Sequence, residues 1–104
     1  MAGVIVSGNG SIDPSTGLLR VAGTAVATGG GNAVITAVCV ESLVIVGVGQ
    51  GSVPADGNSY DWSAELPAVN GPWQTGASAV VTAVLADATG AQVAYGANPS
   101  VAVY

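Results

Sequence analysis

The sequence predicts an all-β domain, a sandwich or a barrel of short strands, from three observations. Valine, alanine, threonine, serine and glycine dominate the chain, and β-branched residues suit a pleated sheet. No helical period stands out along the chain. Turn residues recur about every ten positions, a spacing typical of sandwiches and barrels. The length of 104 residues fits one domain.

The turns set the order of the expected elements. Residues 13–17 predict a turn because Pro14 presets φ, Asp13 can accept hydrogen bonds from the following amides, and Gly17 suits a left-handed conformation. Further breaks are expected at residues 29–32, 41–42, 51–59, 87–90 and 97–99. Between these breaks we expect strands over residues 4–7, 18–28, 33–40, 43–50, 60–66, 77–87, 92–95 and 101–104.

Alternation of apolar and polar residues predicts which faces are buried. In 60–66 the apolar residues Tyr60, Trp62, Ala64 and Leu66 alternate with Asp61, Ser63 and Glu65. Strand 77–87 repeats the pattern, with Ala79, Val81, Ala83 and Leu85 inward.

The strand at 43–50 has two apolar faces. Val44, Val46 and Val48 share one face, and Leu43 and Ile45 share the other. One row must point away from the core unless a neighbour covers it, and we expect a covering neighbour.

Three segments resemble bacterial and phage immunoglobulin-like domains: VAGTA at 21–25, YDWSAELP at 60–67, and VTAVLADATG at 81–90 preceded by Gly76. The resemblance covers residues 18–104 and implies an immunoglobulin-like β-sandwich of seven to nine strands. Residues 1–17 have no counterpart in the pattern and are expected to form a first strand or an arm. The motifs describe a sandwich and no chemistry.

The side chains argue against catalysis. The chain has no histidine and no lysine, and Cys39 has no candidate base, so nucleophilic triads are not expected. Asp61 and Glu65 would lie roughly 13 Å apart on one strand, farther than paired carboxylates in glycoside hydrolysis. We therefore expect no enzyme, no catalytic residue and no cofactor.

Charge and cysteine content restrict the partners. Arg20 is the one basic residue against six acids, which disfavours binding to nucleic acid and to anionic membranes. Cys39 is expected to be a buried thiol; an intermolecular disulfide is the alternative. The N-terminus lacks the basic and apolar regions of a signal peptide, so we expect synthesis in the cytoplasm without secretion.

Possible binding residues are few. Trp73 lies in a loop and could stack on a sugar or anchor a partner, or it could cover the open end of the sandwich. Tyr95 and Tyr104 are expected to be partly buried or interfacial. The Asp56 loop resembles oxygen-rich calcium loops but lacks regular ligand spacing, so its residues are expected to form a turn and no metal site is assigned. The candidate partner interface is Trp73, Tyr95, Val44, Val46 and Val48.

These observations favour a non-enzymatic virion structural protein. We expect a capsid decoration (cement) protein of a tailed phage, or an immunoglobulin-like tail accessory, on the surface of the particle. Its partners would be the major capsid protein or other virion subunits, with homo-oligomers possible. The alternative is an immunoglobulin-like repeat of a bacterial surface adhesin or secreted glycan-binding protein. A stand-alone calcium- or carbohydrate-binding module is a third class.

Overall fold

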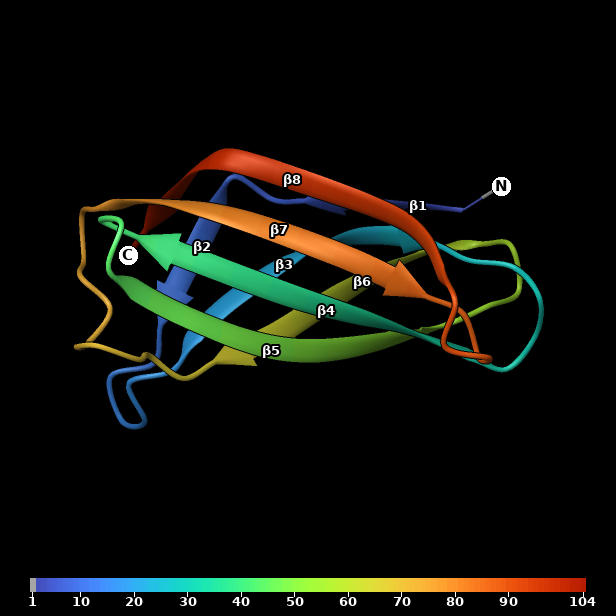
Figure 1. The fold of residues 1–104 in the computed structure, drawn as a ribbon, viewed down its shortest axis with the longest axis horizontal. Helices are drawn as coiled ribbons and strands as arrows, with labels where there is room; N and C mark the ends of the chain where they lie inside the picture. The colour runs from blue at the N-terminus through green and yellow to red at the C-terminus, as the bar shows by residue number, and fades with distance from the viewer. Residues whose placement is uncertain (1) are drawn as a thin grey trace.

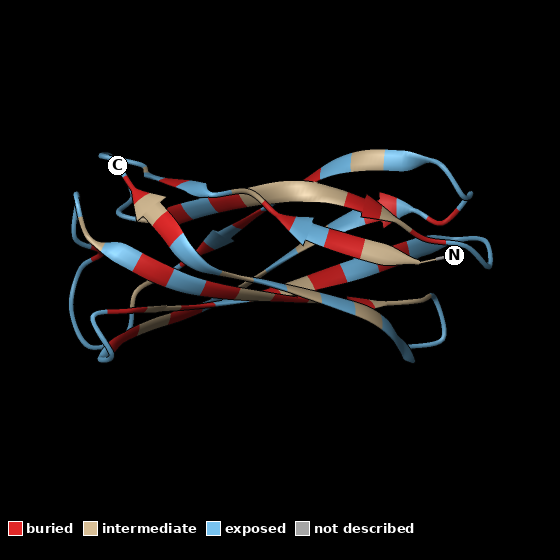
Figure 2. Ribbon diagram, turned by 90° about the horizontal axis from the view of Figure 1, so that it is seen from above, coloured by how far each residue is buried: buried red, intermediate tan, exposed pale blue. Residues whose placement is uncertain are grey.

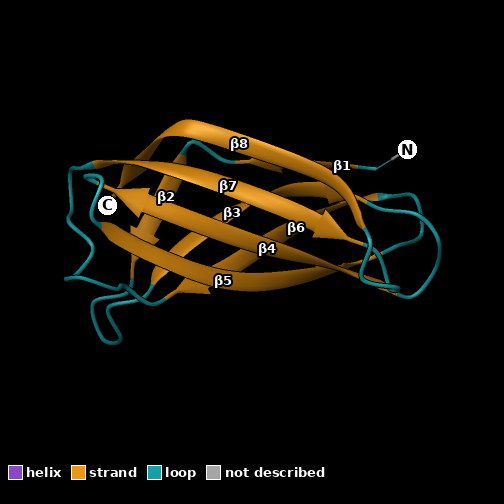
Figure 3. Cartoon of the chain, viewed as in Figure 1, coloured by secondary structure: helices purple, strands orange, loops and turns teal. Residues whose placement is uncertain are grey.

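The computed structural model describes residues 2–104, and these residues form eight β-strands and no helix (Figures 1 and 3). The strands are β1 Gly3–Val6, β2 Asn9–Ile12, β3 Leu19–Val26, β4 Asn32–Glu41, β5 Ile45–Pro54, β6 Ser59–Leu66, β7 Ser78–Ala86 and β8 Gln92–Val103. The predicted all-β class is confirmed, and the number of strands falls within the expected range. In the described residues no helix is long and apolar enough to cross a membrane.

The strands form two layers joined by β2. In one layer β3 pairs antiparallel with β1 and β6, and in the other the order is β8-β7-β4-β5, all antiparallel. Asn9 and Gly10 of β2 pair parallel with β8, and Ser11 and Ile12 pair antiparallel with β3. Figure 1 shows β8, β7, β4 and β5 side by side in front of β3 and β6. Within residues 1–17, expected to form a first strand or an arm, residues 3–6 and 9–12 form two short strands of the sandwich.

The predicted inward faces of 60–66 and 77–87 are confirmed, except that Tyr60 is only partly buried. Trp62, Ala64 and Leu66 of β6 are buried, and the four inward residues predicted for β7 are each at most 1% exposed. Figure 2 shows buried residues alternating with exposed ones along the strands, as a two-layer sandwich requires.

Two expected breaks differ in the structure: one is shorter and one is absent. The predicted loop at 51–59 is shorter because β5 continues to Pro54 and pairs with β4 as far as Asn32. The predicted interruption at 97–99 lies within β8, which is one strand. Ala79 pairs with Val101 and Val81 with Asn98, so β8 carries one extra residue and bulges beside Pro99. A bulge accommodates a proline because no ladder hydrogen bond is required of it there.

Inward-facing glycines bring the two layers together along one edge. Gly47, Gly49 and Gly51 of β5 face the backbone of β6 and of the residue after it, and a Cβ at each would overlap a carbonyl oxygen. The oxygens belong to Pro67, Glu65 and Ser63, respectively. At the other edge Gly96 of β8 faces the carbonyl oxygen of Val4 in the same way. Both edges of the sandwich are closed by main-chain contact, which a larger residue would prevent.

Candidate binding surface

The outward face of β8-β7-β4-β5 is a broad apolar surface. Strand register arranges its side chains in three rows: Val46, Val40 and Val80; Val48, Val38, Thr82 and Ala97; Gln50, Thr36, Val84 and Tyr95. Val48 is 54% exposed and Tyr95 is 68% exposed, and Val38 and Val80 are also exposed. β-Branched aliphatic side chains therefore form the middle of this surface, with Gln50 and Tyr95 at its two edges.

This face carries no charge. Glu41 is the one charged residue in β4, β5, β7 and β8, and its side chain points inward and is fully buried. The opposite layer carries Arg20, Asp61 and Glu65 on its outward face, with Arg20 Nη2 at 3.5 Å from Glu65 Oε1. The other acids, Asp13, Asp56 and Asp87, lie in turns. The two faces of the sandwich are thus electrostatically different.

Four of the five predicted interface residues lie on this side of the molecule. Val44, Val46 and Val48 point outward, next to the row that ends at Tyr95. Trp73 does not belong with them. Its side chain is 5% exposed and its Nε1 donates to the Leu66 carbonyl at 2.9 Å. The indole covers the end of the core, which is the alternative given for it above, and it offers no surface to a partner.

The β4–β5 turn displays an apolar residue that the sequence reasoning did not select. Ser42 and Leu43 have φ of 53° and 66°, and Val44 N donates to Glu41 O at 3.3 Å. Such left-handed conformations in non-glycine residues cost about 1–3 kcal/mol each. Leu43, predicted to share a strand face with Ile45, is instead at the tip and 93% exposed. The sequence predicts a break at 41–42, but without an Asn-Gly signal the pattern placed Leu43 and Val44 in the following strand instead of in the turn.

The apolar tip continues onto a neighbouring loop. Val69 pairs with Val46 through two backbone hydrogen bonds, and its side chain is 53% exposed. Asn70, with φ of 70°, donates from Nδ2 to Val44 O at 3.4 Å. Leu43, Val44 and Val69, hereafter the apolar tip, therefore lie on mutually bonded segments beside the charge-free sheet face.

The carboxyl group of Glu41 is buried at the end of β4, next to the apolar tip. Glu41 Oε1 accepts a hydrogen bond from Gln74 N at 2.6 Å, which fastens the loop at 67–77 to the end of β4. Glu41 Oε2 has no hydrogen-bond partner within the described residues. The Glu41-Ser42 break predicted from the sequence separates the two strands, but nothing in the pattern indicated that the glutamate points inward.

Cys39 is buried and free, as predicted. Burial, and secondarily the nearby Glu41 charge, raises the pKa of the Cys39 thiol to about 11. The group is therefore protonated and unreactive at neutral pH.

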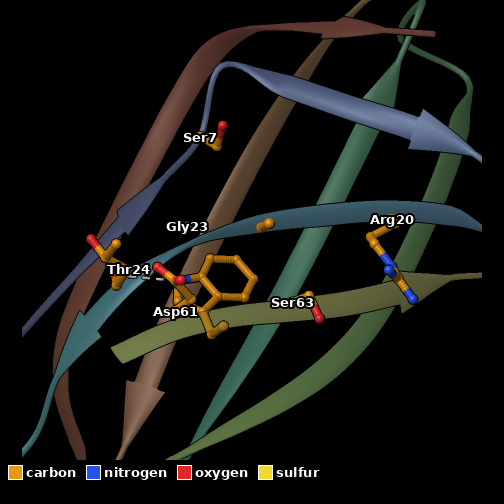
Figure 4. A pocket seen from close by; sticks show the side chains of 8 residues that line it. Ser7, Arg20, Gly23, Thr24, Asp61 and Ser63 are labelled. Atoms are coloured by element: carbon orange, nitrogen blue, oxygen red, sulfur yellow. Dashed lines mark hydrogen bonds between the residues drawn. The ribbon is translucent and has the colours of Figure 1, made fainter. Parts of the chain in front are cut away.

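A groove lies on the opposite, charged face. It has a volume of about 540 Å³ and is lined by β3, β6 and Ser7. Figure 4 shows Arg20 and Asp61 toward its two ends, with Gly23 and Ser63 between them. The Trp62 indole beneath it is fixed, because Nε1 donates to Ile5 O and Thr24 O, each at 3.2 Å. The charged groups of this groove are one guanidinium and one carboxylate. No nucleophile in its lining is paired with a base, so the groove shows no catalytic group of side chains.

The turn acids are used by their own loops. Asp13 Oδ1 accepts from Ser15 N and Asp87 Oδ1 accepts from Thr89 N, and hydrogen bonds from the Ser15 and Thr89 hydroxyls lower the pKa of each carboxyl. The Tyr60 hydroxyl and Asn58 N lower the pKa of Asp56 likewise. In residues 2–104 no group of three His, Cys, Asp or Glu side chains is placed to hold a metal ion.

Comparison of the chain with models of protein families, with curated proteins and with solved structures gave no match.

Proposed function

We propose that the protein is a non-enzymatic structural protein of a virion, a capsid decoration protein of a tailed phage. It would bind capsid subunits through the apolar tip after synthesis in the host cytoplasm, and its charge-free sheet face would also be covered by protein in the assembled particle. The observation that carries the proposal is the charge-free outward face of β8-β7-β4-β5, together with the adjoining apolar tip.

The physical basis is the low cost of covering this surface. Desolvating a charge without a counter-charge is expensive, and this face contains none. Its apolar area stabilises a complex by about 25 cal/mol for each Å² removed from water. The acids on the turns and on the outer side of β6 would remain in solvent and keep decorated particles apart.

The strand arrangement supports the immunoglobulin-like character implied by the sequence resemblance. Immunoglobulin sandwiches divide their strands into one layer containing the first, second, fourth and fifth strands and another containing the third, sixth and seventh. With β1 and β2 counted together as the first strand and β5 as an added edge strand, the described strands divide in the same way, except that none of them corresponds to the fourth strand.

The glycan-binding alternative loses its principal support. It depended on Trp73 as an exposed ring for stacking on a sugar, and Trp73 is buried.

The test is binding of the purified protein to empty capsids assembled from the major capsid protein encoded alongside it. We expect co-sedimentation that saturates at a fixed copy number. A Leu43→Glu variant should bind more weakly, because its charge would have to be desolvated at the contact. The matched control is Ile5→Glu, which makes the same kind of change on the opposite layer, where Ile5 is 66% exposed. Absence of saturable binding contradicts the proposal.

A further inference from the structure

We propose that a second copy of this chain covers the charge-free face, so that the protein is a dimer formed by two β8-β7-β4-β5 sheets packed face to face. The inference rests on the proposed function as an assembly subunit, and it leaves the apolar tip for the capsid. Charge, area and register each support it.

The charge distribution permits two copies to meet on this face and opposes other contacts. Each copy has a formal net charge of −5. Asp61 and Glu65 lie on the outward side of the other layer. With layers roughly 10 Å apart, these acids in one copy would stand roughly 30 Å from those in the other, well beyond a Debye length of about 8 Å. A highly charged partner would lose hydration against this face and gain no counter-charge, whereas an uncharged, β-branched surface fits it.

The size of the face is adequate for a specific contact. Four strands spaced about 4.8 Å apart and about eight residues of 3.3 Å each give a projected area of roughly 500 Å² per copy. The two copies together bury roughly 1,000 Å², which is the lower bound for a specific interface. The expected dimer is therefore of moderate affinity.

The register makes the face complementary to itself. A two-fold axis that runs along the strands between β4 and β7 exchanges β5 with β8 and β4 with β7. In the middle row, Val48 of one copy then faces Ala97 of the other, so that a large side chain meets a small one. In the next row, the Gln50 amide faces the Tyr95 hydroxyl, so that each polar edge group meets another.

The experiment is sedimentation equilibrium of the purified full chain from about 10 µM to about 500 µM, without capsids. We expect a reversible rise from the 9.9 kDa monomer to twice that mass. Val48→Glu should weaken dimerisation by at least roughly tenfold, because two acids would be buried at the contact. Ile5→Glu, on the other layer, should leave the dissociation constant within roughly twofold.

Two results would overturn the inference: a monomer across the whole concentration range, or equal weakening by Val48→Glu and Ile5→Glu. Circular dichroism confirms that each variant is folded. If Val48→Glu is unfolded, Tyr95→Ala replaces it, because the Tyr95 side chain is exposed and its removal leaves the core intact. A monomer that still saturates capsids refutes the dimer alone. A dimer that does not bind capsids refutes the proposed function alone.

Discussion

The close main-chain contact between β5 and β6 predicts that Gly49→Ala destabilises the fold. The added Cβ would overlap the Glu65 carbonyl oxygen and stand 3.0 Å from Leu66 Cδ1. Leu66 can adjust, but the carbonyl belongs to the backbone of a paired strand and cannot move without separating the layers. Inserting a methyl group into such a contact costs about 1–3 kcal/mol.

The cost is partly offset because alanine restricts the unfolded chain, an effect worth about 0.4–1 kcal/mol. Because a backbone carbonyl obstructs the added methyl group, we place the overpacking cost at the upper end of the range of about 1–3 kcal/mol. We therefore expect a net loss of about 2 kcal/mol in the free energy of unfolding. For a domain of this size the melting temperature should fall by roughly 8–16 °C.

Urea unfolding followed by tryptophan fluorescence measures the change, with Gly3→Ala as the matched control. Gly3 is also a strand glycine, but its added Cβ would have no neighbour within 4 Å. It should be neutral or slightly stabilising. If Gly49→Ala is as stable as Gly3→Ala, the close approach of the two layers is wrong.

Three further predictions follow from buried and turn side chains. Because burial raises its pKa to about 11, Cys39 should resist iodoacetamide at pH 8 in the folded protein and react once urea unfolds it; rapid labelling of folded protein would show that the thiol is accessible. The pKa values of Asp13, Asp56 and Asp87 are lower in the folded protein than the unfolded-chain value near 3.8. These carboxylates therefore stabilise the fold fully at a pH above 3.8, and their contribution is lost as the pH falls through their lower folded-state pKa values. Unfolding in urea at several pH values should therefore show stability decreasing below about pH 4, and an increase there would contradict the turn geometry. Glu41→Ala should lower the free energy of unfolding by about 2 kcal/mol or more, because it leaves Gln74 N without its acceptor and opens a cavity. Glu41→Gln keeps the acceptor oxygen and should cost clearly less; equal losses would mean that the hydrogen bond contributes nothing.

Much of the fold could be predicted because local signals agreed with the tertiary environment. The two-residue period in β6 and β7 identified their buried faces, and the Asp13 and Asp87 turns form from side-chain acceptors close in the sequence. The glycine-rich end of β5 has the composition of a loop. Its glycines are instead required by the approach of β6, a long-range contact that composition does not reveal.

The candidate surface was predictable only in part. The row Val44, Val46 and Val48 follows from strand period alone, whereas its place on the same face as Tyr95 depends on the β7–β8 register. That register contains a bulge that local pattern cannot locate. Leu43 was missed because its turn uses left-handed residues without glycine or asparagine. The burial of Trp73 is set by a hydrogen bond to Leu66 and by the space that Gly47 leaves.

The most direct test of whether another protein chain covers the β8-β7-β4-β5 face is side-chain footprinting of the protein at high concentration and on capsids. Tyr95 and Val48 should be protected from radical or carbene labelling under both conditions, while Ile5 on the opposite layer remains labelled. If Tyr95 and Val48 label as freely as Ile5 in every assembly, the face is solvent-exposed and the account is contradicted.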